Sequence, residues 1–322
     1  MSMLRAGIRR SGSTGRRWTG RRRRHEAAHA ARPRGAAADV PGACGRRVPT
    51  RGRGGRIAAT AARLTGPPVM RNADRWQPSK YVRRRGRLVA SRDVREVGVG
   101  SRLVADAVAA RYDAALAHYA RGRLADLGCG KVPLYGVYRH LVTSVTCVDW
   151  AASPHGALHL DREADLGAEL PFADASFDTV ILSDVLEHVP EPALLWRETA
   201  RLLGAGGHAL VNVPFLYGVH EAPHDYFRYT EFALRRFAER AGLQVLVLEP
   251  VGGSLDVLAD LLAKHLAQLP LAGRGLAAAV QAVAQAVGRT GPGRRLAAKT
   301  APRFPLGYFM VCRCPADGDA AP

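Results

Sequence analysis

The chain has 322 residues, of which 47% are apolar, and a formal net charge of +19. The apolar fraction is ordinary for a globular protein with a core. Residues 1–69 contain 17 Arg, no Lys and only two acidic residues, a net charge of +15, so residues 70–322 carry only +4. The basicity therefore belongs to a tail, and the nearly neutral body argues against a fold that itself binds nucleic acid.

Residues 1–69 are rich in Arg, Gly and Ala and show no sustained apolar periodicity. Such a segment cannot bury enough apolar surface to offset its chain entropy, so we expect a disordered tail. It could bind polyanions, act as an organelle presequence, or be upstream sequence translated from a mis-assigned start. The use of Arg without Lys, and Met70 directly before the first protein-like segment, favour the third interpretation, with the true start near Met70.

The sequence also bears on the compartment. The N-terminus has no apolar core beside its charges, so no secretory signal is visible. The five cysteines are odd in number and lack framework spacing, which fits reduced thiols. We therefore expect a cytoplasmic protein.

Residues 70–100 are polar and basic and are expected to form an N-terminal arm. Ser101 can cap a helix in which apolar residues recur at helical spacing up to Tyr119. Strands and helices then alternate. We expect strands over residues 123–127, 145–149, 157–160, 177–183, 208–213 and 243–248, helices over residues 192–203 and 231–241, and an incomplete helix over residues 132–140. This alternation predicts an α/β sheet with helices on both faces and a ligand at the carboxyl ends of the strands.

Residues 254–300 look like an insertion. Leu255, Leu258 and Leu262 begin one apolar stripe at helical spacing, and a second stripe follows from Leu276. Neither predicted helix is long or apolar enough to span a bilayer. We expect a helical hairpin that packs on the domain or on a partner subunit, with a lid over the substrate or a peripheral membrane contact as alternatives. A final strand over residues 304–314 comes after it.

The most informative local pattern is LADLGCG at residues 124–130, an apolar run that enters a glycine turn. Asp149 closes the next strand 19 positions after Gly130, close to the roughly 20 expected when a glycine turn and a ribose-binding acid serve one nucleoside. A carboxylate can accept two hydroxyl hydrogen bonds, which suits a ribose. Pro133 stands where the dinucleotide fingerprint G-x-G-x-x-G needs its third glycine. The pattern therefore predicts an adenosine-containing cofactor and disfavours a dinucleotide.

Two further runs narrow the family, LPFADASFDTV at residues 170–180 and LEHVP at residues 186–190. Together with DLGCG, they make the chain resemble the class I S-adenosylmethionine-dependent methyltransferases, particularly the group that acts on small molecules. The resemblance covers about residues 100–250 and the last strand. It implies a Rossmann-like, seven-stranded, mostly parallel sheet with an antiparallel last strand, a domain over residues 101–315, and S-adenosyl-L-methionine as cofactor.

The resemblance also implies roles for single residues. Asp149 would take both ribose hydroxyls, and Asp165 would sit near the adenine amino group. The residues expected along the methionine moiety are Asp126, Gly128, Gly130, Ser183 and Asp184, the last two also bordering the substrate. Val132 replaces the third glycine of the family's D-x-G-x-G-x-G pattern and is expected to open the following helix without touching the ligand.

A sulfonium is already a good leaving group, so in-line methyl transfer needs positioning more than covalent catalysis. A base is needed only if the acceptor is a hydroxyl or another weak nucleophile. The candidate bases are His188 in LEHVP and His220 and His224 in VHEAPHDYFRYT (219–230), although each could serve a purely structural role.

A metal-binding site is a less favoured interpretation of the same residues. Asp184, Glu187 and His188 have D-x-x-E-H spacing and could share a divalent ion with His220 or His224. We assign no metal, because similar E-H-V-P segments occur in relatives without one.

We therefore predict a methyltransferase that acts on a small molecule, a lipid precursor or a glycan. The alternative is a nucleic-acid-binding protein, or a nucleic-acid methyltransferase, that uses the Arg-rich tail. It lacks support because no Asn-Pro-Pro-Tyr-type motif follows the fourth strand, where the chain reads SDVL. The acceptor, the methylated atom and the oligomeric state stay open.

Overall fold

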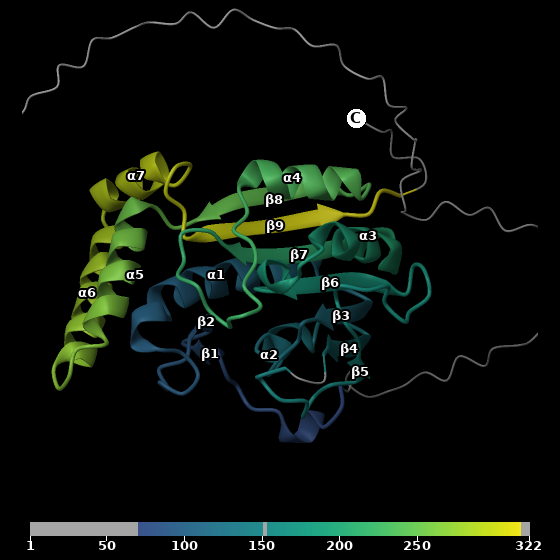
Figure 1. Ribbon diagram of the computed structural model, residues 1–322, viewed down its shortest axis with the longest axis horizontal. Coiled ribbons are helices and arrows are strands. Elements are labelled where there is room, and N and C mark those ends of the chain that lie inside the picture. Colours follow the sequence, from purple (N-terminus) through teal and green to yellow (C-terminus); the bar gives the residue numbers. More distant parts are fainter. Residues whose placement is uncertain (1–69, 151–152, 317–322) are drawn as a thin grey trace, which may run out of the picture. The chain divides into compact units, whose positions relative to one another are not determined.

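A seven-stranded sheet organises the chain in the computed structural model, which describes residues 70–150 and 153–316 (Figure 1). Its strand order is β5-β4-β3-β6-β7-β9-β8. The strands are β3 (Arg123–Leu127), β4 (Ser144–Asp149), β5 (Arg162–Glu163), β6 (Phe177–Ser183), β7 (Leu203–Pro214), β8 (Gln244–Val251) and β9 (Gly307–Arg313). The first five pair in parallel, whereas β9 lies between β7 and β8 and is antiparallel to both. The predicted sheet is confirmed. The predicted tail, residues 1–69, lies outside the described residues.

Helices cover both faces of the sheet (Figure 1). On one face α1 (Arg102–Tyr119) and α2 (Tyr135–Tyr138) bury Ile181, and on the other α3 (Pro192–Leu202) and α4 (Glu231–Arg240) bury Val180 and Leu182. This alternation follows from the two-residue period of β6. Full burial of each such side chain stabilises the fold by about 1.5–3 kcal/mol.

Two predicted elements are wrong in detail. Residues 157–160 form a turn, because Leu160 N–H bonds to Ala157 O at 3.3 Å and its side chain packs into the core. The third strand comes instead at β5, where Arg162 pairs with Val148. The helix predicted over residues 132–140 is only the single turn α2.

Residues 70–100 pack into the same core as α1. They form the 3-10 turns η1 (Ala73–Arg75) and η2 (Val99–Ser101) and a hairpin of β1 (Tyr81–Arg84) and β2 (Arg87–Ala90). Arg85 and Gly86, at its tip, both have positive φ, as a tight two-residue hairpin turn requires.

The predicted helical insertion consists of α5 (Ser254–Leu266), α6 (Gly273–Arg289) and α7 (Gly291–Thr300), the last of which was not predicted. The leucine stripe is largely exposed, at 65% for Leu258 and 50% for Leu262. Asp260, on the same helix, is buried and pairs with Lys264 at 2.6 Å. Within the described part of the chain, no helix has the length and apolarity that crossing a membrane requires.

The insertion also caps α1. The Ser101 side chain was expected to do so, but its Oγ lies 3.2 Å from the Tyr217 hydroxyl and makes no capping bond. Instead the buried Gln281 of α6 accepts a hydrogen bond from Leu103 N–H at 3.0 Å, and its amide donates to Gly100 O. The insertion thus satisfies a backbone donor that the first turn of a helix leaves unpaired.

Three of the five cysteines, Cys129, Cys147 and Cys312, are buried free thiols.

Gln281→Ala should destabilise the protein by about 2 kcal/mol, because it leaves the Leu103 N–H and the Gly100 carbonyl buried without partners. Urea denaturation would measure this. The matched control is Gln268→Ala on the exposed end of the insertion, which should change stability by less than about 0.5 kcal/mol. Equal stability of the two variants would show that α6 does not cap α1.

Candidate active site

A cavity of about 1140 Å³ opens at the carboxyl ends of the parallel strands. It is lined by nine of the ten residues predicted for the site: Asp126, Gly128, Asp149, Asp165, Ser183, Asp184, His188, His220 and His224. Gly130 is not part of the lining. The cavity exceeds the upper end of the range of about 300–1,000 Å³ typical for one ligand, so it has room for a cofactor and an acceptor together.

The turn after β3 is built on Gly128. Its φ is +71°, and a Cβ there would lie 2.5 Å from Val185 Cγ2. The amides of Gly128 and Cys129 both donate to Val148 O, at 2.8 and 3.1 Å. A side chain would therefore be excluded both by conformation and by space.

Asp149 is held by this turn. Its Oδ2 accepts a hydrogen bond from Gly130 N–H at 2.8 Å, and its Oδ1 accepts one from Trp150 N–H at 2.9 Å. Gly130 thus acts through Asp149, not by lining the cavity. A carboxylate has about four acceptor positions, so each oxygen retains one for a ligand hydroxyl.

Asp126 is the second acid at this end. It is buried and accepts a hydrogen bond from the Tyr138 hydroxyl at 2.9 Å. Burial raises the pKa of Asp126 to about 7; the Tyr138 bond opposes this shift, and the charge of Asp149 adds to it. The free protein therefore holds Asp126 partly protonated near neutral pH.

Asp184 is fixed by residues that sequence reasoning missed. Its carboxylate accepts bonds from Lys80 Nζ at 2.6 Å and from Asn212 Nδ2 at 2.5 Å, and its φ is +57°. Lys80 is 104 residues away in the chain, and nothing in its local sequence distinguishes it from the neighbouring basic residues. This pair ties the N-terminal arm to the end of β6.

Val132 does not open a helix, which corrects the expectation. It is a fully buried turn residue three positions before α2, with φ +50°. Glycine adopts this conformation freely, whereas a β-branched residue rarely does. Its carbonyl accepts a hydrogen bond from Trp76 Nε1 at 3.0 Å. As expected, Val132 does not line the cavity.

Two loops meet at the other end of the cavity. The turn η3 (Leu186–His188) follows β6, and residues 219–230 follow β7, which pairs with β6 in parallel. Tyr226 N–H donates to Glu187 O at 2.8 Å, and the Tyr229 hydroxyl donates to Leu186 O at 2.8 Å. These bonds hold the second loop against the LEHVP segment.

The bonds of His188 and His220 fix which ring nitrogen carries the proton. His188 Nδ1 lies 2.6 Å from His224 O, an acceptor only, so Nδ1 is the donor. His220 Nδ1 lies 3.3 Å from Asp225 Oδ2, and Asp225 is in turn paired with Arg228. Burial, with the nearby His188, lowers the pKa of His220. In both rings Nδ1 is therefore occupied by an oxygen acceptor, and Nε2 is the nitrogen left for the cavity.

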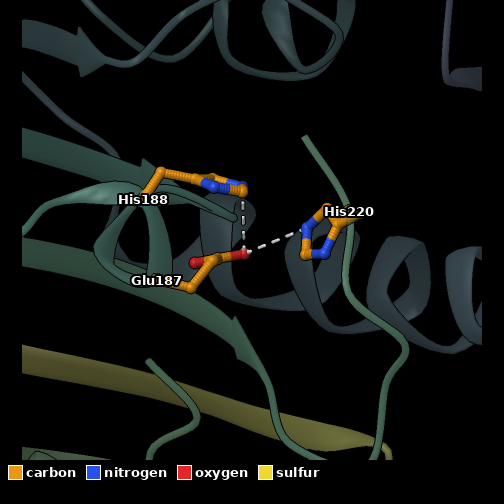
Figure 2. A group of neighbouring side chains, drawn as sticks. All are labelled: Glu187, His188 and His220. Atoms are coloured by element: carbon orange, nitrogen blue, oxygen red, sulfur yellow. Dashed lines mark ion pairs between the residues drawn. The ribbon is translucent and has the colours of Figure 1, made fainter. Parts of the chain in front are cut away.

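Both Nε2 atoms face Glu187 (Figure 2). They lie 3.8 Å (His188) and 3.9 Å (His220) from Glu187 Oε1. Glu187 is fully buried, and neither of its Oε atoms has a hydrogen-bond partner among the described residues. Burial, reinforced by the charge of Asp184, raises the pKa of Glu187 well above its usual range. The sequence suggested that Glu187 and His188 could meet His220 or His224, and the structure brings them together with His220.

The remaining predicted residues lie toward Asp149. The His224 ring packs edge-on against Trp150, with centroids 5.2 Å apart, and its Nδ1 lies 3.1 Å from the Tyr226 hydroxyl. Asp165 accepts a hydrogen bond from Gly167 N–H at 2.7 Å, which shapes a turn at the cavity wall. His224 thus lies outside the cluster of Glu187, His188 and His220.

Residues 125–211 match the family model described as a methyltransferase domain. The ubiquinone biosynthesis O-methyltransferase of Xanthomonas euvesicatoria pv. vesicatoria (strain 85-10) is 32% identical over 166 residues, which cover 42% of this chain and 67% of that protein. The protein of the same name from Xanthomonas oryzae pv. oryzae (strain PXO99A) is 37% identical over 120 residues, which cover 33% of this chain and 47% of that protein. The chain thus spans about half of the second relative.

Among solved structures, a SAM-dependent methyltransferase from Archaeoglobus fulgidus superposes with a TM-score of 0.42 and 14% identity. The match covers 63% of this chain and 91% of that chain.

Gly128→Ala should lower stability by about 3 kcal/mol, because it adds a Cβ where Val185 leaves no space and strains a left-handed residue. Gly86→Ala is the matched control, since its φ of +77° is similar but nothing lies within 4 Å of its Cβ. It should cost only about 1 kcal/mol. Thermal unfolding of both variants would measure the difference, and equal losses would mean that the turn is not crowded.

Proposed function

Because the chain belongs to the class I S-adenosylmethionine-dependent methyltransferases, we propose that it transfers the methyl group of S-adenosylmethionine to an oxygen of a small-molecule acceptor. The observation that carries this proposal is the Asp149 carboxylate, which is oriented by two backbone amides and has an acceptor position left on each oxygen at the cavity wall. The choice of oxygen is supported by the two relatives named O-methyltransferases.

At the cofactor end, we propose that Asp149 binds the two ribose hydroxyls and that Asp165 lies near the adenine. Asp126 and the Gly128 turn would take the methionine moiety, with Ser183 and Asp184 beside it. Bound S-adenosylmethionine supplies a methyl group on a sulfonium, already a good leaving group. The ionised form of Asp126 suits the positive charges of that moiety, whereas the charge of Asp184 is already paired with Lys80.

At the acceptor end, the cavity wall is partly apolar. Val104 and Val108 of α1 and Leu306 before β9 lie on it. We propose that an apolar part of the acceptor packs there, which favours a small aromatic molecule or a lipid precursor over a glycan. Two of these residues lie on the helix that the insertion caps through Gln281, so the insertion supports the acceptor end.

An acceptor hydroxyl must lose its proton on methylation. We propose that the Nε2 of His188 or His220 accepts that proton, because both residues line the cavity and their Nδ1 atoms are occupied by other acceptors. The Asp225–Arg228 pair behind His220 holds its ring in this orientation. His224, which contacts Trp150, is a third candidate.

Asp149→Ala should weaken S-adenosylmethionine binding by at least about 100-fold, because two charge-assisted hydrogen bonds are lost. Isothermal titration calorimetry would measure this, with one-to-one binding expected for the unmodified chain. Asp161→Ala is the matched control: Asp161 also accepts two backbone N–H bonds, from Arg71 and Cys147, but does not line the cavity. No binding by the unmodified chain, or full binding by Asp149→Ala, would refute the proposal.

S-adenosylmethionine affinity should rise roughly tenfold from about pH 6 to about pH 7.5, because the cationic ligand favours ionised Asp126 and must displace its proton at low pH. The sign follows from the raised pKa of about 7 in the free protein. Asp126→Asn cannot ionise, so its affinity should lack this rise, and calorimetry of both at the two pH values tests it. A rise that persists in Asp126→Asn would assign the titration to another group. The titratable groups around Asp126 are Tyr138, Asp149, Tyr112, Cys129 and Cys147.

A further inference from the structure

Three electron-pair donors converge at the acceptor end of the cavity, and no described hydrogen-bond donor lies between them. The Nε2 atoms of His188 and His220 point toward Glu187 Oε1 (Figure 2), and the three ligand atoms lie within 4.8 Å of one another. Lone pairs that face one another repel unless a positive charge lies between them. The arrangement therefore needs a proton or a cation at its centre.

We propose that Glu187, His188 and His220 form a binding site for one divalent metal ion. A buried carboxylate is normally paired or bound to a metal, whereas both oxygens of Glu187 lack a partner among the described residues. The two rings are pre-oriented by second hydrogen bonds, of His188 to the His224 carbonyl and of His220 to the Gly218 carbonyl, with Asp225 beside the His220 ring. Histidine ligands of metals are held in this way.

Two of the three ligand pairs already have separations that suit such an ion. Two ligands that each bind at about 2.1 Å can be at most about 4.2 Å apart, and the two Glu187–histidine separations are 3.8 and 3.9 Å. The separation of the two histidine nitrogens is bounded only at 4.8 Å. The ligand set of two imidazoles and one carboxylate favours Mn²⁺, Fe²⁺, Co²⁺, Ni²⁺ or Zn²⁺ over Mg²⁺ and Ca²⁺, which prefer oxygen.

The ligand set differs from the one that spacing suggested. Asp184 lies four positions before His188 but its carboxylate is taken by Lys80 and Asn212. Residues 186–188 form a 3-10 turn, which does not stack the side chains of Asp184 and His188 as an α-helix would. Of the suggested ligands, Glu187 and His188 remain, His220 joins them from the facing loop, and Asp184 is not part of the cluster.

The site also has room for a further ligand. Three protein ligands leave coordination positions open, as in catalytic metal sites, and all three residues line the cavity. An acceptor hydroxyl that binds there would have a lowered pKa. This role rests on the proposed function. With the ion bound, His188 and His220 would act as its ligands and not as bases, and the ion would promote the proton loss.

Titration of the chelator-treated full chain with Co²⁺, followed by calorimetry and by visible absorption, tests the site. We expect one Co²⁺ per chain with absorption bands of nitrogen and oxygen ligation. Glu187→Gln and His220→Gln should each weaken binding by about 100-fold or more, since even indirect supports of a metal site are worth 10–100-fold. His224→Gln, in the same loop but outside the cluster, should bind as the unmodified chain does.

Circular dichroism would verify that Glu187→Gln is folded, which we expect because the neutral amide suits a buried position. No Co²⁺ binding by the unmodified chain, or binding by Glu187→Gln and His220→Gln as tight as that of the unmodified chain, would overturn the site and leave a proton on Glu187 as the occupant. S-adenosylmethionine binding to the metal-free chain is measured in parallel. If the metal-free chain does not bind S-adenosylmethionine, that result counts against the proposed function and not against the metal site.

Discussion

The carboxylate of Asp149 joins the ends of two neighbouring parallel strands. It accepts hydrogen bonds from Gly130 after β3 and from Trp150 after β4, and this is possible only because Gly128 turns the chain with a positive φ beside Val185. The turn must fold back over β4, so the acid is held at the sheet edge in one orientation. Parallel pairing of β3 with β6 and of β6 with β7 then brings the loops after those strands to the same edge. The cavity follows from these connections.

The opposite end of the cavity depends on contacts between loops. The carbonyl of Glu187 accepts the Tyr226 amide, and the carbonyl of His224 accepts the His188 ring. These bonds hold the unpartnered Glu187 side chain next to two imidazoles. A buried carboxylate in such surroundings is destabilising unless it is protonated or bound to a cation. We therefore infer that this end of the cavity holds a proton or a cation. We therefore propose that the end of the cavity at Asp149 binds the nucleoside and that the end at Glu187 binds a metal ion and the acceptor.

The sequence predicted those parts of the fold and site that depend on local patterns. The apolar runs of β3, β4 and β6 set their own boundaries closely, and the spacing from Gly130 to Asp149 reflects two adjacent parallel strands. Contacts between distant residues had no such signal. Lys80 reaches Asp184 across 104 residues, and Gln281 caps α1 at Leu103 across 178. The short strand β5 was misplaced because Leu160 supplies an apolar residue that packs into the core without pairing. His220 was a candidate base from its loop, but its approach to Glu187 depends on how two loops pack.

The most direct test of the two-ended cavity is a crystal structure of the full chain with S-adenosylhomocysteine and Mn²⁺, with the ion located by its anomalous signal. We expect both ribose hydroxyls on the Asp149 carboxylate, the thioether sulfur directed toward η3, and a single Mn²⁺ peak bounded by Glu187, His188 and His220. A nucleoside bound away from Asp149, or a sulfur directed away from η3, would contradict this arrangement of the two ends.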